Sequence, residues 1–258
     1  MPETGISDDL IARASGWIRG AERTVCLTGA GISTESGIPD FRSRGGVWDR
    51  FDPRDFDIRR WRASGEVRRR YWAATRDTYP RVLGAEPSGG HRALARLAQA
   101  GILSLLITQN TDGLHQKAGH DAERVVELHG TRHFCVCVDC GERMSRLAVH
   151  ERVLAGEEMP VCGCGGFLKP DAVFFGESIA PDRLRRAVAS SETAQVFLVA
   201  GSSLAVRPAG ALPEKAFQAG ARLIIVNDSP TRLDDLGDAL LRGKTGEILP
   251  ALVSAILD

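Results

Sequence analysis

The stretch TVCLTGAGISTESGIPDFR, residues 24–42, decides the fold. It opens with a short β-type run, TVCLT, that stops at Gly29, and Ala30 and Gly31 follow directly. Small residues after a strand let the backbone come close to a phosphate, and the N-terminus of a following helix offers N–H groups to it. The dinucleotide fingerprint G-x-G-x-x-G is incomplete, because Thr34 takes its sixth position. Alone, the loop indicates either a nucleotide site or a plain strand-to-helix turn.

Strand-like and helical patterns alternate along the rest of the chain. The apolar runs ILSLLIT (102–108), QVFLVA (195–200) and LIIV (223–226) are typical of strands covered on both faces. Shorter strands are expected at 125–128 and 172–175. Helical patterns lie between or after the strands, near 91–100, 181–190, 208–219 and 246–257. This order predicts an α/β fold with a Rossmann-like parallel sheet.

A cysteine-rich segment interrupts the alternation. Cys137 and Cys140 form C-x2-C, and Cys162 and Cys164 form C-x-C, with 21 residues between the pairs. Four thiolates predict one structural Zn²⁺ per chain, with no open position for catalysis. The C-x-C pair has one residue fewer between its cysteines than the C-x2-C pair, so its coordination geometry stays open, and Cys135 is an alternative ligand. The other interpretation is a small module of reduced cysteines without metal.

These patterns divide the chain into three parts. We expect a Rossmann-like domain made of residues 1–42, 82–130 and 169–258. A helical insert, residues 43–81, would cover the loop that follows the first strand. A small zinc-ribbon-containing module, residues 131–168, would be inserted in the sheet domain.

Composition excludes several classes of protein. The 33 basic and 33 acidic residues balance, which removes any general argument for nucleic acid or an anionic membrane as partner. No apolar run approaches the ~18 residues that span a bilayer, and the first 20 residues resemble no secretory or transit signal. We therefore expect a cytoplasmic protein, and favour a monomer. Between residues 54 and 81, nine arginines face four acidic residues, which indicates either a solvated helical face or steering of an acidic substrate.

Six motifs in order resemble those of the sirtuins. They are GAGISTESGIPDFR (29–42), TQNTDGLH (108–115), LHG (128–130), LKPDAVFFGE (168–177), GSSL (201–204) and VN (226–227). The resemblance implies an NAD-dependent protein-lysine deacylase that consumes NAD and releases nicotinamide and O-acyl-ADP-ribose. An acylated-lysine protein or peptide would be its substrate.

The resemblance also implies roles for individual residues. The catalytic residues would be His129, Asn110 and Asp112. His129 would be the general base, because the unperturbed pKa of histidine lies near the working pH. The NAD site would comprise Gly29, Ala30, Gly31, Thr34, Asp40, Phe41, Arg42, Gln109, Asn110, Asp112, His129, Gly201, Ser202, Ser203, Asn227, Asp228 and Thr245. The substrate would lie along Val173, Phe174, Phe175, Gly176 and Glu177, by strand addition. The remaining histidines are expected to be structural or on the surface, with His115 behind the site.

Several alternatives stay open. The sequence looks closest to a class II-like branch, but the Tyr-x-x-Arg pair of members that remove acidic acyl groups is absent, since Ala74 and Val82 follow Tyr71 and Tyr79 by three residues. Mono-ADP-ribosyl transfer would use the same NAD pocket. A zinc-ribbon adaptor for nucleic acid lacks basic residues interleaved with aromatics. A hydride-transfer dehydrogenase would need the complete glycine motif.

Overall fold

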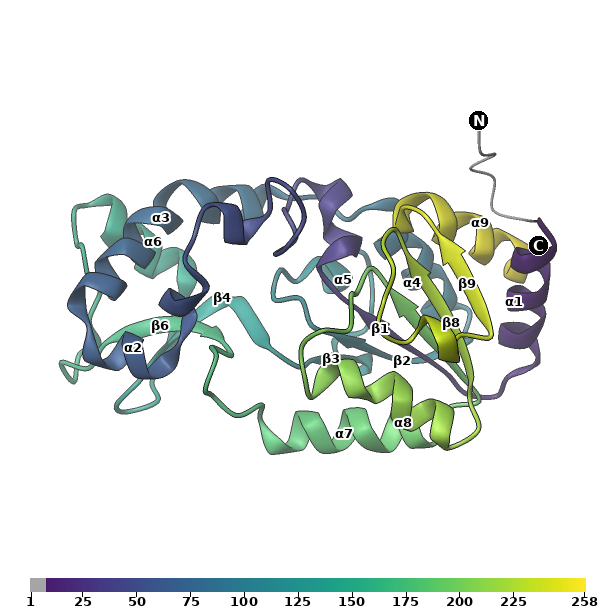
Figure 1. Ribbon diagram of the computed structural model, residues 1–258. Helices are drawn as coiled ribbons and strands as arrows, with labels where there is room; N and C mark the ends of the chain where they lie inside the picture. Colours follow the sequence, from purple (N-terminus) through teal and green to yellow (C-terminus); the bar gives the residue numbers. More distant parts are fainter. Residues whose placement is uncertain (1–7) are drawn as a thin grey trace.

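Strand β1 (Thr24–Thr28) lies in the middle of a six-stranded sheet in the computed structural model, which describes residues 8–258. The order of the strands is β3-β2-β1-β7-β8-β9, and every pairing is parallel. The other strands are β2 (Leu103–Thr108), β3 (Val125–Glu127), β7 (Val196–Ala200), β8 (Arg222–Asn227) and β9 (Ala239–Arg242). The predicted Rossmann-like parallel sheet is therefore confirmed (Figure 1).

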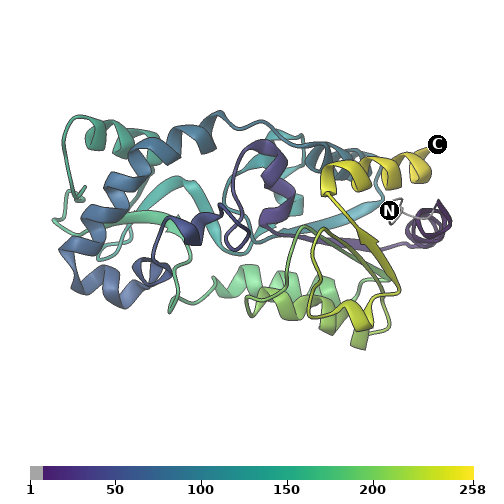
Figure 2. The same cartoon turned by 45° about the horizontal axis from the view of Figure 1, so that its top comes forward.

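Helices cover both faces of this sheet. On one face lie α1 (Asp8–Gly20), α4 (Gly89–Gln99) and α9 (Thr245–Leu257). On the other face lie α7 (Pro181–Glu192) and α8 (Leu212–Gln218). Figure 2 shows the two layers from a second direction.

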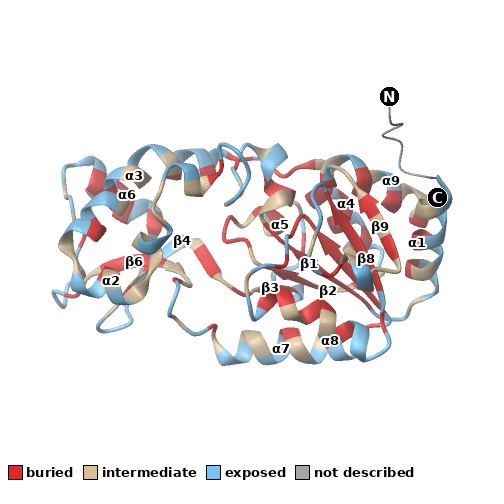
Figure 3. Ribbon diagram, viewed as in Figure 1, coloured by how far each residue is buried: buried red, intermediate tan, exposed pale blue. Residues whose placement is uncertain are grey.

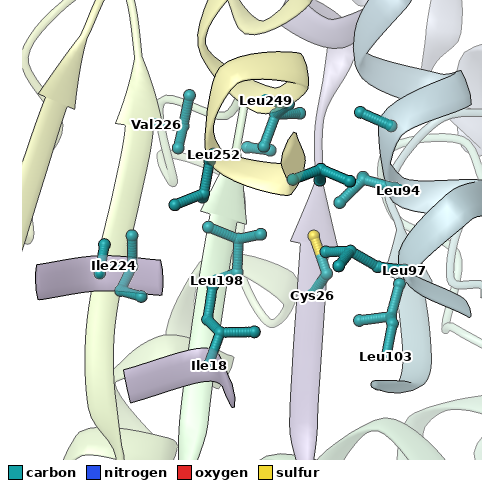
Figure 4. Close-up of a cluster of buried hydrophobic side chains, with 14 of the residues drawn as sticks. Ile18, Cys26, Leu94, Leu97, Leu103, Leu198, Ile224, Val226, Leu249 and Leu252 are labelled. Atoms are coloured by element: carbon teal, nitrogen blue, oxygen red, sulfur yellow. The ribbon is translucent and has the colours of Figure 1, made fainter. Parts of the chain in front are cut away.

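The strands bury side chains on both faces, as their apolar runs predict. Cys26, Leu198 and Ile224 pack against α1, α4 and α9, as Figure 4 shows. The alternate residues, such as Leu27 and Phe197, pack toward α7 and α8. In Figure 3 the burial is accordingly concentrated in the parallel sheet.

A second unit lies at one end of the sheet domain, at the left of Figure 1. Its three-stranded antiparallel sheet has the order β5 (Arg143–Ser145), β4 (Gly130–Cys137) and β6 (Leu168–Ala172). Helices α2 (Ile58–Ala63), α3 (Gly65–Gly84) and α6 (Arg146–Leu154) complete it. The core of this unit combines Trp61 and Trp72 with Cys135, Leu168 and Phe174. The helical segment that precedes β2 and the cysteine-rich segment thus share one core.

Short helices connect these elements. Helix α5 (Leu114–Lys117) follows the loop after β2. The 3₁₀ helices are η1 (Ala30–Ser36), η2 (Val47–Asp49), η3 (Pro53–Phe56), η4 (Ala122–Arg124), η5 (Ala209–Ala211) and η6 (Asp234–Leu236). Among residues 8–258, no helix has both the length and the apolar character that a membrane crossing requires.

The structure corrects two features of the sequence analysis. The strand predicted at 172–175 is wrong: the strand is β6, which ends at Ala172 and pairs antiparallel with β4. The run AVFF is apolar because Phe174 fills the core of the small unit, whereas Phe175 is exposed. Strand β9 was not predicted, because ALLR is too short a run to stand out. The division into domains stays a prediction, and α3 continues past its boundary at residue 81 to Gly84.

Candidate active site

A cavity of about 1380 Å³ lies at the carboxyl ends of the parallel strands. Strand β1 has β2 on one side and β7 on the other, so the chain order reverses there, which is where open α/β sheets bind ligands. The cavity exceeds the ~300–1,000 Å³ of pockets for single drug-sized ligands, so it has room for two reactants. All the residues predicted for NAD and substrate, from Gly29 to Thr245, line it.

The loops after β1 and β7 meet through their glycines. Gly31 N donates to Gly201 O over 2.8 Å. A Cβ at either Gly29 or Gly31 would lie 2.8 Å from Gly201 O, and one at Gly201 (φ 64°) would collide with the backbone nitrogen of Ile32. The glycines are therefore required for close packing of two loops at the base of the cavity, where both expose backbone to a ligand.

Asn110 and Asp112 are held together by a third residue, Ser33. Asn110 Nδ2 donates to Ser33 Oγ (3.0 Å) and to Gly29 O (3.1 Å). Ser33 Oγ donates to Asp112 Oδ2 over 2.8 Å, and Leu114 N donates to Asp112 Oδ1 over 3.0 Å. Asn110, Asp112 and Ser33 are all buried. Sequence reasoning missed Ser33, and its only signal was its position two residues after Gly31.

His129 follows β3 and has a defined tautomer. Its Nδ1 lies 3.0 Å from the backbone oxygen of Gln109, which can only accept, so Nδ1 carries the hydrogen and Nε2 has the free lone pair. Burial lowers the pKa of His129, and the bond to Gln109 offsets this in part. A neutral imidazole with a free Nε2 on the wall of a cavity is suited to accept a proton.

Gln109 is partly engaged within the protein. Its Nε2 donates to Ser202 Oγ over 2.7 Å, and Ser202 Oγ also accepts from Leu204 N over 3.2 Å. This bond ties the loop after β2 to the loop after β7. Asn227 likewise donates to Ser229 O over 2.6 Å and fixes the loop after β8.

Asp40 shapes the segment that covers the cavity. It accepts from the backbone of Arg42 (2.9 Å) and from the backbone (2.7 Å) and hydroxyl (2.6 Å) of Ser43. Burial would raise the pKa of Asp40, but these bonds and the charge of Arg42 lower it below its usual value. Phe41 stacks on Trp48 with 5.1 Å between ring centroids. Asp40 is therefore an ionised residue that stabilises its own turn at the edge of the site.

The predicted substrate stretch has most of its donors engaged. Val173 N donates to His129 O (2.9 Å), and Phe175 N donates to Phe56 O (2.8 Å). Phe174 N donates to Glu177 Oε2 (2.7 Å), and that carboxylate also pairs with the buried ammonium of Lys169 at 3.1 Å. Phe174 O and Phe175 O already accept from Glu177 N and Ile58 N, each over 3.0 Å, so an added peptide strand would have to use Val173 O or the backbone of Gly176.

The four predicted zinc ligands form one cluster. Cys137 Sγ lies 3.6 Å from Cys164 Sγ, Cys140 Sγ lies 3.7 Å from Cys162 Sγ, and all four lie within 4.8 Å of one another. A tetrahedral Zn²⁺ with Zn–S bonds of ~2.3 Å separates its sulfurs by about 3.8 Å, so this set fits zinc.

The C-x-C half closes the cluster through a tight turn. Gly165 N donates to Cys162 O (2.9 Å), Gly165 has φ 86°, and Cys162 N donates to Gly166 O (2.8 Å). A Cβ at Gly166 would lie 2.6 Å from Cys137 Sγ. Cys135 lies outside the set: it packs in the core and accepts from Arg146 Nη1 at 3.6 Å. The alternative with Cys135 as ligand is therefore wrong.

Three other histidines form a buried group behind the site. The ring centroids of His91 and His115 are 4.7 Å apart, and those of His115 and His120 are 5.4 Å apart. His115 Nε2 lies 2.9 Å from the hydroxyl of Thr28, at the end of β1. Burial lowers the pKa of His91 and of His120 to about 4, and that of His115 well below its usual value. These residues are structural, and His115 supports the strand end beside the cavity.

Known proteins resemble this chain along nearly its whole length. The family model described as Sir2 family matches residues 29–208. NAD-dependent protein deacetylase 2 of Streptomyces coelicolor is 45% identical over 89% of this chain and 96% of its own. NAD-dependent protein deacetylase of Haloarcula marismortui is 41% identical over 96% and 94%. A solved structure of a Sir2 mutant with deacetylated p53 peptide and 3′-O-acetyl ADP ribose matches at a TM-score of 0.87 and 34% identity, over 95% of this chain and 97% of its own. The chain belongs to the Sir2 family.

Proposed function

We propose that the chain is an NAD-dependent protein-lysine deacylase that releases nicotinamide and O-acyl-ADP-ribose. One observation carries the proposal: His129, with its free Nε2, lies in the same cavity as the Asn110–Ser33–Asp112 cluster and the glycine loops. The names of the two relatives, both NAD-dependent protein deacetylases, support it.

The residues around the cavity fit NAD. The backbone N–H groups of Ser202 and Ser203 donate to no other group in residues 8–258, so they can meet phosphate oxygens. The hydroxyl of Thr245, at the start of α9, is buried without a protein partner, and Thr245 lines the same cavity. We assign the phosphates and adenosine to the end of the cavity beside Gly29, Gly31, Gly201, Asn227 and Asp228.

The opposite end of the cavity would hold the nicotinamide and the acyl-lysine. NAD supplies an electrophilic ribose carbon when its nicotinamide leaves. Asn110 and Asp112, fixed by Ser33, would orient the nicotinamide side and keep bulk water out. His129 Nε2 would accept a proton from a ribose hydroxyl, and its bond to Gln109 holds the ring in the required tautomer.

The substrate is a peptide segment that carries an acylated lysine. Related Sir2 structures at 34–35% identity hold an acetylated and a propionylated peptide. We propose that the peptide lies along residues 173–177, where Phe175 is exposed beside the cavity. Phe41, Arg42 and Thr34 would border the cofactor from the covering segment.

The test is a direct assay of both products. The protein is incubated with NAD and acetyl-, propionyl- and butyryl-lysine peptides, and nicotinamide and O-acyl-ADP-ribose are followed by mass spectrometry. We expect both products in equal amounts and their loss in His129→Ala. His150→Ala, a buried histidine of the small unit that packs on Tyr79, serves as the control and should retain turnover.

Two results would contradict the proposal. Intact acyl-peptide beside ADP-ribosylated protein would favour the ADP-ribosyltransferase alternative. No nicotinamide release with any acceptor would exclude both reactions.

Other expectations remain predictions. We propose a cytoplasmic monomer without a specific nucleic acid partner, and a class II-like branch within the family. Size-exclusion chromatography with light scattering tests the monomeric state, and fractionation of the source cells tests the cytoplasmic location.

A further inference from the structure

Arg146, the first residue of α6, is a buried cation on the wall of the cavity. Only 2% of its surface is exposed. Its guanidinium carbon lies 4.3 Å from the ring centroid of Trp72, 5.0 Å from that of Tyr79 and 5.8 Å from that of Tyr71. Nη1 donates to Cys135 Sγ at 3.6 Å, and the other guanidinium nitrogens donate to no group in residues 8–258. The cation is thus enclosed by aromatic rings, it retains N–H groups without an acceptor in residues 8–258, and Arg146 lines the cavity.

No carboxylate of residues 8–258 comes within 4.0 Å of this guanidinium. The acidic residues near the reacting end of the cavity are engaged elsewhere: Asp112 with Ser33, and Glu177 with Lys169. A buried charge without a partner is unfavourable, so a counter-charge is expected from outside the chain.

Three neighbouring residues, Tyr71, Tyr79 and Arg132, add hydrogen-bond donors and positive charge. Tyr71 and Tyr79 line the cavity, and neither hydroxyl has a hydrogen-bond partner among residues 8–258. Arg132 donates from Nε to Thr111 Oγ1 over 2.8 Å and likewise has no carboxylate partner. Burial raises the pKa of the Tyr71 hydroxyl, while the charges of Arg146 and Arg132 act to lower it.

We propose that Arg146, assisted by Arg132, Tyr71 and Tyr79, binds the terminal carboxylate of a dicarboxylic acyl group, such as succinyl or glutaryl, on the substrate lysine. A guanidinium with free N–H groups matches the two oxygens of a carboxylate, and the tyrosine hydroxyls add donors. His129 and Arg146 line the same cavity, so an acyl group can extend from the lysine carbonyl near His129 toward Arg146. The inference rests on the proposed deacylase function, whose substrate class it narrows.

A comparison of matched acyl groups tests the idea without a mutation. Succinyl-lysine and succinamoyl-lysine peptides have the same shape and differ by one negative charge. We expect wild-type protein to deacylate the succinyl peptide with a kcat/KM about 10- to 100-fold above that for the succinamoyl peptide, mainly through KM. Isothermal titration of the same peptides into NAD-free protein should likewise show tighter binding of the succinyl peptide than of the succinamoyl peptide.

Variants then assign the effect to Arg146. Arg146→Met keeps the length of the side chain and removes the charge, so the acid-to-amide ratio of kcat/KM should fall about 10- to 100-fold. Arg146→Lys should restore part of that ratio. Arg69→Met, which removes an exposed charge from α3 of the same unit, should leave the ratio unchanged.

Three outcomes are distinct. A wild-type protein that removes acetyl groups but does not prefer the acid over the amide overturns this inference and leaves the deacylase function intact. A parallel loss for acid and amide in Arg146→Met shows a merely structural role. No turnover of any acyl-peptide contradicts the proposed function itself.

Discussion

At the scale of single residues, Ser33 connects the proposed catalytic groups. Its hydroxyl accepts from Asn110 and donates to Asp112, and only 1% of its surface is exposed. A hydroxyl that bonds to an ionised carboxylate in a buried site contributes more than a neutral pair, because little water competes. It therefore controls how two reactive side chains sit relative to each other.

We expect Ser33→Ala to lower kcat/KM for deacylation about 10- to 100-fold and the free energy of unfolding by about 1–2 kcal/mol. Steady-state kinetics and urea unfolding measure the two effects. Ser191→Ala is the matched control, since Ser191 is an equally buried hydroxyl in α7 that donates to Ala187 O over 2.7 Å, away from the cavity. Equal activity losses in both variants would assign the effect of Ser33→Ala to stability alone.

Sequence patterns could locate residues that lie in motifs, but not their partners in space. His129, Asn110 and Asp112 stand directly after strands, where parallel topology brings loop residues to one edge. Arg146 gave no signal, because it is 75 residues from Tyr71 and only the packing of α6 on α3 brings them together. The absence of the Tyr-x-x-Arg pair therefore does not exclude a positive charge in the acyl pocket.

At the scale of elements, the turn that carries Cys162 and Cys164 is linked to β4 through the cysteine cluster. Cys137 belongs to β4, and the cluster fixes this strand against the turn that precedes β6. A unit with so small a core depends on such a link, because metal binding contributes directly to its folding.

We expect about one zinc per chain by plasma mass spectrometry, and its loss in Cys164→Ser. Cys135→Ala is the matched control, because Cys135 is a buried cysteine of the same strand outside the cluster. It should keep its zinc. A metal-free but folded wild-type protein, or loss of zinc in the control, would refute the four-cysteine site.

Element prediction failed where two units share a segment. The run after Lys169 has the composition of a buried sheet strand, yet its Phe174 is buried by Trp61 and Tyr71 rather than by a neighbouring strand. Local periodicity reports burial but does not say which core provides it. For the same reason, residues 43–81 and the cysteine segment could not be joined into one unit from sequence.

At the scale of the whole molecule, three neutral histidines are packed beneath the loop that carries Asp112. His91 and His120 have pKa values lowered to about 4 by burial, although Asp112 opposes the shift at His91, and burial also lowers the pKa of His115. In the unfolded chain each has its ordinary value near 6.5. The unfolded state therefore binds more protons than the folded state between about pH 6.5 and 4.

The free energy of unfolding should accordingly be constant above pH 6.5 and fall as the pH decreases toward 4.5. We expect each histidine to contribute on the order of 1 kcal/mol per pH unit in this window. Urea unfolding at pH 7.0, 6.0 and 5.0 measures the slope. His120→Gln removes one titrating group, so its slope should be lower than that of wild type, while any loss of zinc with acid affects both alike. A flat profile in the wild type would contradict the prediction.

The strand order has a consequence for the synthesis of the chain. Thr24 of β1 pairs with Leu103 on one side but with Val196 on the other. The ribosome adds roughly 5–20 residues per second, so it needs about 10 s to make the residues between β2 and β7. During this time one edge of β1 has no partner strand. An apolar strand with free N–H and C=O groups is a template for unwanted pairing. The nascent chain therefore needs cover for this edge until the second half of the sheet emerges.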